Sequence, residues 1–204
     1  MKLIVDTSNH ALILLLIWPN GQTKYFLDLN TRDFSANTAE QVSVFLKTNS
    51  VKPSDLTAVI AGVGPGSYTG TRVAATIVKT LAYALNIPVY SISSLALFAS
   101  ALKEEKVIIY KSARNQNYYV GVFAENQAVQ ADALLKENEL NEIISKKSDF
   151  KALELGTITE FSGEFNLKLI ENSLVSVDSF ALEPNYLRKT EAEINYDQKN
   201  NWRG

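Results

Sequence analysis

Short apolar runs separated by turn residues open the chain. The runs Leu3–Val5, Ala11–Trp18 and Thr23–Leu29 predict three strands, and the uninterrupted apolar character of the second indicates burial on both faces. Asn20 and Gly21, between the last two runs, favour a two-residue hairpin turn because both residues tolerate positive φ. The pattern therefore predicts a three-stranded antiparallel meander at the N-terminus.

Helical periodicity follows this meander. Val42, Phe45 and Leu46 form an apolar stripe that predicts a helix beginning at Thr38, which can pair with Gln41 in a reciprocal cap. The remaining elements then alternate between strand and helix, and the first half reads βββαβαβα. In chain order we expect the helix Thr38–Thr48, the strand Thr57–Ala61, the helix Thr71–Asn86, the strand Val89–Ile92 and the helix Ser94–Leu102.

The second half repeats the first part of this order in abbreviated form. We expect strands at Lys106–Tyr110, Tyr118–Ala124 and Ala128–Ala131, a helix at Glu137–Lys146 and a strand at Ala152–Leu155. After Gly156 the repeat stops, because no glycine cluster or long apolar helix follows and 157–170 is poorly periodic, although Leu174–Val177 can form a last strand. We therefore predict one subdomain at 1–103, a shortened second one at 104–188 with a docked end, and a polar, mobile tail at 189–204.

The most distinctive stretch is the glycine loop, Gly62-Val-Gly-Pro-Gly-Ser-Tyr-Thr-Gly-Thr-Arg72. A strand, a glycine loop and a helix in succession can bind anions through free backbone N–H groups. The named phosphate motifs fail, however, because a Walker loop needs Lys after its last glycine, and Ser67 and Thr69 stand where a dinucleotide fingerprint has its third glycine. The alternative is structural, in which the glycines allow a sharp turn and close packing.

The helix predicted after this loop carries few charges. From Thr71 to Asn86 the only charged residues are Arg72 and Lys79. A stripe of larger apolar side chains suits the sheet, namely Val73, Ile77, Leu81 and Leu85. The other faces carry small or neutral residues where a surface helix normally has charges, namely Ala74, Ala75, Thr76, Thr80, Ala82, Tyr83 and Ala84. Either a second helix of this chain or a partner protein covers them, and uncharged exposed patches favour interfaces.

Composition excludes several classes of chemistry. The 204 residues include no cysteine and one histidine, His10, so disulfides, zinc ribbons, thiolate nucleophiles and His-rich metal sites are excluded. We interpret His10 as a turn or strand residue. The net charge of −2 argues against nucleic-acid binding by the chain alone. The longest apolar run has eight residues and a membrane span needs about 20, so we expect a cytoplasmic protein that is not in a membrane.

Three polar residues suggest chemistry, each with a simpler alternative. Asp6 could be a nuclease carboxylate, but the fourth strand offers no second one, so we expect Asp6 to bond its own turn at Thr7 and Ser8. Ser67 could be a nucleophile, but Gly-x-Ser-x-Gly is absent. Arg72 could form a surface ion pair or contact a partner or a phosphate, and the sequence leaves these readings open.

Five segments together resemble the TsaB family, also called YeaZ, over nearly the whole chain. They are Val5-Asp-Thr-Ser8, the glycine loop, Asn86-Ile-Pro-Val89, Ser93-Ser-Leu95 and Pro184-Asn-Tyr-Leu-Arg-Lys-Thr-Glu-Ala-Glu193. The resemblance implies an α/β protein with the actin/Hsp70-like (ASKHA) fold of two RNase-H-like halves, the second half shortened. Phe34-Ser35-Ala36 departs from the family, since many members have His-Ser-Glu there, and Ser112-Ala113-Arg114 stands where they have Asp-Ala-Arg.

The same resemblance implies a function. TsaB proteins are non-catalytic partners of TsaD, which with TsaE attaches threonylcarbamoyl, supplied as threonylcarbamoyl-AMP, to the adenosine beside the tRNA anticodon. It implies no catalytic residue, metal or cofactor here, contact with tRNA only through the complex, and a homodimer when the chain is alone. The implied partner interface comprises Thr38, Val42, Phe45, Arg72, Ala75, Thr76, Lys79, Thr80 and Tyr83. The implied vestigial phosphate loops comprise Asp6, Thr7, Ser8, Gly64, Gly66 and Ser67. The alternative is an actin-like ATPase or kinase that uses Asp6–Ser8 and the Gly62–Gly70 loop.

Overall fold

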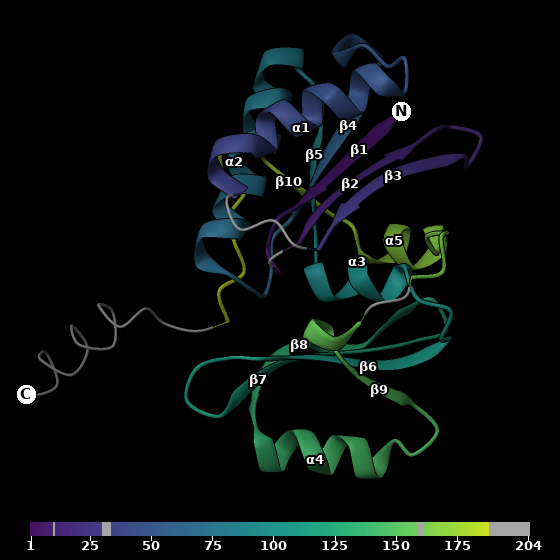
Figure 1. Ribbon diagram of the computed structural model, residues 1–204, viewed down its shortest axis with the longest axis vertical. Helices are drawn as coiled ribbons and strands as arrows, with labels where there is room; N and C mark the ends of the chain where they lie inside the picture. The colour runs from purple at the N-terminus through teal and green to yellow at the C-terminus, as the bar shows by residue number, and fades with distance from the viewer. Residues whose placement is uncertain (10, 30–33, 159–160, 188–204) are drawn as a thin grey trace, which may run out of the picture.

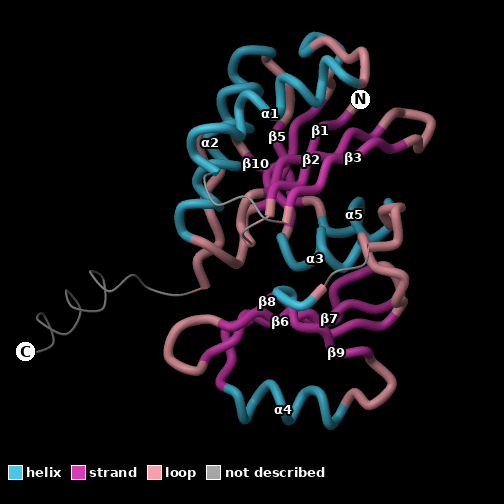
Figure 2. The backbone as a smooth tube through the Cα atoms, in the orientation of Figure 1, coloured by secondary structure: helices cyan, strands magenta, loops and turns pink. Residues whose placement is uncertain are grey.

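Two β-sheets stacked end to end, with helices between and outside them, make up the molecule (Figure 1; Figure 2). The structure, a computed structural model, describes residues 1–9, 11–29, 34–158 and 161–187, with residues 34–36 described as backbone only. His10 and the tail at 189–204 lie outside the described residues. The elements are β1 (Lys2–Asp6), β2 (Leu12–Ile17), β3 (Thr23–Asp28), α1 (Phe34–Thr48), η1 (Pro53–Asp55), β4 (Ala58–Gly62), α2 (Tyr68–Leu85), β5 (Val89–Ile92), α3 (Ser94–Ser100), β6 (Lys106–Ser112), β7 (Asn117–Ala124), β8 (Gln127–Lys136), α4 (Glu137–Lys146), β9 (Lys151–Glu154), η2 (Leu155–Thr157), α5 (Leu167–Ser173) and β10 (Val175–Val177).

The first sheet has the strand order β10-β5-β4-β1-β2-β3. β1 pairs antiparallel with β2 and parallel with β4, so it lies at the centre. Both faces of β1 and β2 are buried, because Leu3, Leu12 and Leu14 face α1 and α2 whereas Ile4 and Ile13 face α3 and α5. The prediction of burial on both faces is therefore confirmed.

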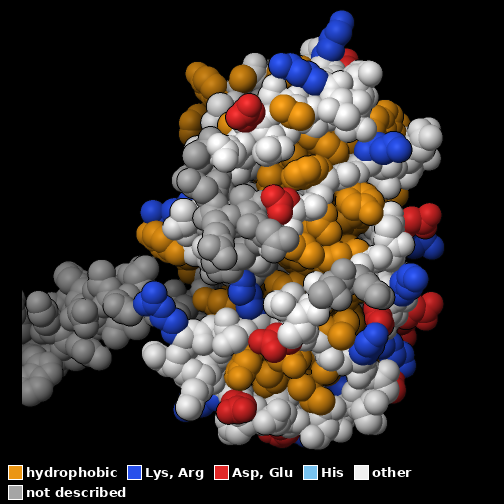
Figure 3. Space-filling model, in the orientation of Figure 1, with side chains coloured by type: hydrophobic (Ala, Val, Ile, Leu, Met, Phe, Trp, Pro, Cys, Tyr) orange, Lys and Arg blue, Asp and Glu red, His pale blue; other side chains and the backbone are white. Residues whose placement is uncertain are grey.

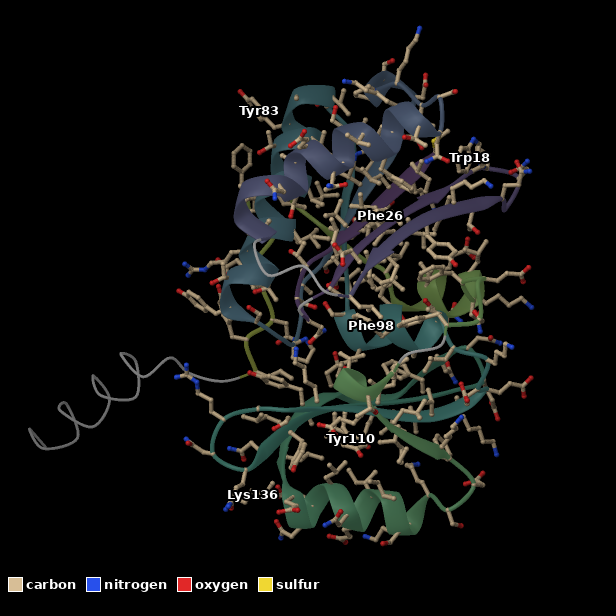
Figure 4. The ribbon with its side chains drawn as sticks, viewed as in Figure 1. Trp18, Phe26, Tyr83, Phe98, Tyr110 and Lys136 are labelled. Carbon is tan, nitrogen blue, oxygen red and sulfur yellow. The ribbon has the colours of Figure 1, made fainter. Side chains whose placement is uncertain are left out.

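The second sheet repeats this arrangement with the order β8-β7-β6-β9. β6 pairs antiparallel with β7 and parallel with β9, as β1 does with β2 and β4. α4 covers the outer face through Leu140, while Val107, Ile109 and Phe123 join the core around α3. Phe98 of α3 lies between the two sheets and is fully buried (Figure 4). The two halves share one strand order, which confirms the predicted fold class. Within the described residues the second half has no counterpart of α2.

The expected boundaries are wrong in several places. The loop between β2 and β3 has three residues, 19–21, and not the two that we expected. Trp18 N donates to Gln22 O at 2.9 Å across this loop, and Gly21 at its end has a φ of +83°. α1 begins at Phe34, so Thr38 is not its cap. The sequence pattern did not predict α5, which packs on α3. The strand β8 extends beyond the expected range at both ends.

The C-terminal part of the described chain returns to the first half. β10 pairs antiparallel with β5. After it Leu182 is buried in the core beneath α2, and Asn185 N donates to Val63 O at 2.7 Å. The proposed division at residue 103 therefore needs one correction, since residues 175–187 pack with the first half and not with 104–174.

Within the ranges that the structure describes, no helix combines the length and apolar character needed to cross a membrane.

Candidate functional site

The glycine loop is packed against the turn that follows β1. A methyl group at Gly70 would overlap the carbonyl oxygen of Thr7, and one at Gly66 would overlap that of Ser8. Ser67 N donates to Ser8 O at 2.6 Å, and the Thr7 hydroxyl donates to Gly70 O at 2.5 Å. Ser67 also caps α2, which therefore begins at Tyr68 and not at Thr71. The loop thus uses its glycines for close packing, the structural alternative that the sequence left open.

Asp6 is the buried centre of this turn. Its Oδ1 accepts hydrogen bonds from the Ser8 amide and the Ser8 hydroxyl, both at 2.8 Å, and its Oδ2 accepts one from the Ser94 hydroxyl. Burial raises the pKa of Asp6, while these hydrogen bonds oppose the shift. Ser94 also accepts from the amide of Gly64 at 2.9 Å. The expected bond between Asp6 and its own turn is confirmed, and Asp6 is joined to the loop through Ser94.

Lys111 approaches the same turn from the second half. Its Nζ donates to Asn9 Oδ1 at 2.9 Å, and Asn9 donates in turn to the Ser8 hydroxyl at 2.8 Å. Burial lowers the pKa of Lys111 to about 8, although the charge of Asp6 acts in the opposite direction. Among the described residues no group of three or more His, Cys, Asp or Glu side chains could hold a metal ion.

Two consecutive serines connect the halves at the start of α3. Ser94 binds Asp6 of the first sheet, and Ser93 donates to Asp132 Oδ2 of the second at 2.5 Å. Ser93 also accepts from Ala96 N at 3.1 Å, which caps α3. Burial raises the pKa of Asp132 to about 6, while the Ser93 hydrogen bond acts against this. Two side-chain hydrogen bonds at the start of α3 therefore join the two halves beside their shared apolar core.

Asp132 makes stability depend on pH. Because its pKa is raised from 3.8 to about 6 on folding, it favours the folded state below pH 3.8 and this contribution is lost as the pH rises through 6.

Asp132→Asn keeps an acceptor for Ser93 and removes the charge. We expect it to raise the free energy of unfolding at pH 7.5 by about 1–3 kcal/mol, and the gain to disappear near pH 4. Urea denaturation at both pH values measures this. Asp149→Asn, at a surface carboxylate paired with Lys106, should show no such gain; an equal gain there would contradict the assignment.

The proposed interface residues divide into two groups. Thr38, Val42, Phe45 and Ala75 are buried within the chain, so they support α1 and α2 from below. The exposed members are Arg72, Thr76, Thr80 and Tyr83, and Lys79 is half-buried with its Nζ donating to Phe180 O at 3.2 Å. The helix packs on the sheet through smaller side chains than we expected, namely Ala74, Ala75, Val78 and Ala82, while Val73, Ile77, Leu81 and Leu85 are only partly buried.

The exposed surface of α1 and α2, here called the α1/α2 face, carries three exposed large hydrophobic side chains, Val44, Tyr68 and Tyr83. Tyr83 is 79% exposed and points away from the body at the far end of α2 (Figure 4). Val44 on α1 and Tyr68 at the start of α2 are about half exposed. Figure 3 shows hydrophobic side chains at the outer edge over α2, at the upper left. α1 thus covers one flank of α2 and residues 178–187 another, but neither covers this face.

Arg72 contacts neither a carboxylate nor a backbone carbonyl within the described residues. Its Nε donates to the Tyr186 hydroxyl at 2.8 Å, and its Cζ lies 3.9 Å from the centroid of the Tyr68 ring. The two rings stack with centroids 5.2 Å apart, and the hydrogen bond to Tyr186 is the main cause that raises the pKa of Arg72. Among the residues that the structure describes, Arg72 therefore forms no surface ion pair. Its place in the second turn of α2 also removes the expected conflict with the helix dipole.

Sequence reasoning missed several residues of this site. Asp132 and Lys111 lie far along the chain from Asp6, and no local pattern connects them. Ser93 and Ser94 stand before an apolar helical run, which is a capping signal, but the sequence does not reveal their partners. The sequence predicts a docked end for the second subdomain, but no local pattern predicts the contact between Tyr186 and Arg72.

Comparison with known proteins supplies the family. The family model described as TsaD, tRNA N6-adenosine threonylcarbamoyltransferase, matches residues 28–146, which is more than half of the chain. The chain belongs to this family. A Bacillus subtilis relative named tRNA threonylcarbamoyladenosine biosynthesis protein TsaB is 25% identical, over 95% of this chain and 96% of its own. A Haemophilus influenzae relative of the same name is 26% identical, over 97% and 86% respectively. The resemblance to TsaB proteins is therefore confirmed.

Solved structures agree with this assignment at the level of the fold. A Pseudomonas aeruginosa protein described as similar to the peptidase YEAZ superposes with a TM-score of 0.73 at 22% identity, over 92% of this chain and 99% of its own. The structure described as YeaZ from Pseudomonas aeruginosa superposes with a TM-score of 0.72 at 21% identity, over 91% and 99%. Identities this low concern the fold alone.

Proposed function

We propose that this chain is a non-catalytic subunit in the biosynthesis of threonylcarbamoyladenosine in tRNA. Two relatives that match over most of both chains are named as proteins of threonylcarbamoyladenosine biosynthesis, which supports a role in this process. In this role the chain binds TsaD through the α1/α2 face and holds it in a competent conformation, TsaE joins the pair, and tRNA is contacted through the complex in the cytoplasm. The division into a non-catalytic and a catalytic subunit is part of the proposal.

The observation that carries this proposal is the α1/α2 face, which no described part of the chain covers. A helix that is fully solvated normally exposes charged side chains, whereas α2 exposes Thr76, Thr80 and Tyr83 along 18 residues that contain only two charges. Large apolar side chains at an exposed surface are typical of protein interfaces. A chain that buries this face against TsaD removes the apolar area from water.

The rival function is an ATPase or kinase that uses Asp6–Ser8 and the glycine loop. The packing of that loop on Thr7 and Ser8 favours a structural role, because the Ser67 amide already donates to Ser8 O and is not available to a phosphate. Calorimetry of the isolated chain with Mg-ATP separates the two. We expect no saturable heat at millimolar nucleotide, and stoichiometric binding would overturn the non-catalytic assignment.

Reconstitution tests the proposed function directly. TsaD, TsaE, the enzyme that forms threonylcarbamoyl-AMP and substrate tRNA are combined with and without this chain. We expect modification of the tRNA to depend on its presence, and equal yields without it would contradict the proposal. Gel filtration of the chain alone should give a homodimer, since the apolar face is otherwise exposed; a strict monomer at high concentration would count against this assignment of the face.

A further inference from the structure

One cation on the α1/α2 face, Arg72, is held beside two aromatic rings. Tyr68 and Tyr186, which are 118 residues apart in the chain, stack on each other beside Arg72. The Arg72 Nε donates to the Tyr186 hydroxyl, and the guanidinium lies over the Tyr68 ring. Arginine side chains lose much conformational entropy when they are ordered, so a guanidinium that is already ordered before binding loses less on association.

The ordered guanidinium retains donors. With Nε bonded to Tyr186, the two terminal nitrogens of this exposed side chain form no ion pair within the described residues. Lys79, the other cation of α2, differs because its Nζ is bonded to the carbonyl of Phe180. Both cations of α2 therefore keep free donors, but Arg72 is ordered beside two aromatic rings and lines the groove between α1 and α2, whereas Lys79 does not line it.

This groove runs beside Arg72. It has a volume of about 390 Å³ and lies between the start of α1 and the first half of α2, lined by Ala39, Tyr68, Thr69, Arg72, Val73, Thr76 and Ile77. Among the described residues of this lining, Arg72 alone is charged. Small and apolar side chains on the floor suit a close helix approach, and a single cation at the edge suits a single anion.

We propose that Arg72 is the specificity-determining contact of the α1/α2 face, and that it binds the carboxylate of an aspartate or glutamate on a TsaD helix seated in this groove. The inference rests on the proposed function and adds the chemistry of the partner surface. Charge complementarity carries it, since an ordered arginine fork with its terminal nitrogens open matches a planar carboxylate. Tyr68 and Tyr186 act as positioning residues, and aromatic residues around an arginine are the usual composition of an interface hot spot.

A pair of matched substitutions tests this inference. Arg72→Gln and Lys79→Gln each remove one positive charge from the same helix. We expect Arg72→Gln to weaken TsaD binding about 10- to 100-fold and to reduce the salt dependence of the dissociation constant, and Lys79→Gln to change affinity less than about threefold. Tyr186→Phe, which keeps the ring and removes the hydroxyl, should weaken binding severalfold. Calorimetry at two salt concentrations measures all three, with thermal unfolding to show that each variant folds.

Charge reversal gives the decisive measurement. Arg72→Glu should bind TsaD poorly, and exchange of one acidic residue for arginine on the facing TsaD helix should restore affinity for this variant only. Equal effects of Arg72→Gln and Lys79→Gln, or no rescue by any such exchange, would overturn the inference. The proposed function would survive either result if Thr76→Arg still abolishes binding. If Thr76→Arg also has no effect, the proposed face itself is wrong.

Discussion

Thr76→Arg is expected to abolish binding to TsaD while the chain remains folded. Thr76 is exposed at the middle of α2 and lines the groove, so a longer charged side chain there does not disturb the core. In the complex the new charge would be buried without a partner and close to Arg72, one turn away, which costs about 3–5 kcal/mol or two to four orders of magnitude in affinity. We choose arginine as the replacement because a glutamate at position 76 would pair with Arg72 at the i, i+4 spacing of the helix, so Thr76→Glu would not leave an unpaired charge.

Pull-down and calorimetry with TsaD measure this effect, and circular dichroism monitors the fold. Asn141→Arg is a matched control, since Asn141 is exposed on a helix of the other half, α4. Binding that survives Thr76→Arg, or that is lost equally with Asn141→Arg, would contradict the placement of the interface. Ala75→Arg is unsuitable for this purpose, because Ala75 is 5% exposed and its replacement would disrupt the core.

Gly70→Ala is expected to have the largest effect on stability. The added methyl group would overlap the Thr7 carbonyl, which is backbone and is fixed by a hydrogen bond between the Thr7 hydroxyl and Gly70 O. Relief requires the start of α2 to move away from β1, so we expect a loss of more than about 3 kcal/mol in the free energy of unfolding.

Chemical denaturation checks this expectation against a second glycine. A methyl group at Gly156 would meet no atom within 4 Å, so Gly156→Ala should change stability by less than about 0.5 kcal/mol. If Gly70→Ala is tolerated as well as Gly156→Ala, the loop is not packed on β1 as described here.

Much of the fold could be predicted because local pattern and tertiary role agree in its central elements. The unbroken apolar run of β2 predicted a strand buried on both faces, and the repeated βββαβ order predicted two related halves. Prediction failed where tertiary contacts decide. β10 is a three-residue edge strand whose pairing with β5 has no local signal, and α2 packs through alanines because they allow close approach to the sheet.

The site was less predictable than the fold, for a related reason. The low charge of α2 is a local property, so the sequence revealed the α1/α2 face, but which side chains reach its surface depends on the rotation of the helices. Thr38, Val42 and Phe45 were assigned to a partner and instead pack inside the chain. The hydrogen bond between Arg72 and Tyr186 joins residues 114 positions apart, a pairing that only the folded chain brings about.

The two adjacent serines at the start of α3 also affect how freely the two halves can rotate relative to each other. In a hinged enzyme the halves open and close around a ligand, and the joint between them is soft. Here Ser93 and Ser94 are bonded to opposite halves, and Phe98 fills the space behind them. A rotation of one half relative to the other would break the hydrogen bonds of both serines and would at the same time expose apolar surface. A protein docked on α1 and α2 would therefore contact a half whose orientation toward the second sheet is stabilised by these two hydrogen bonds.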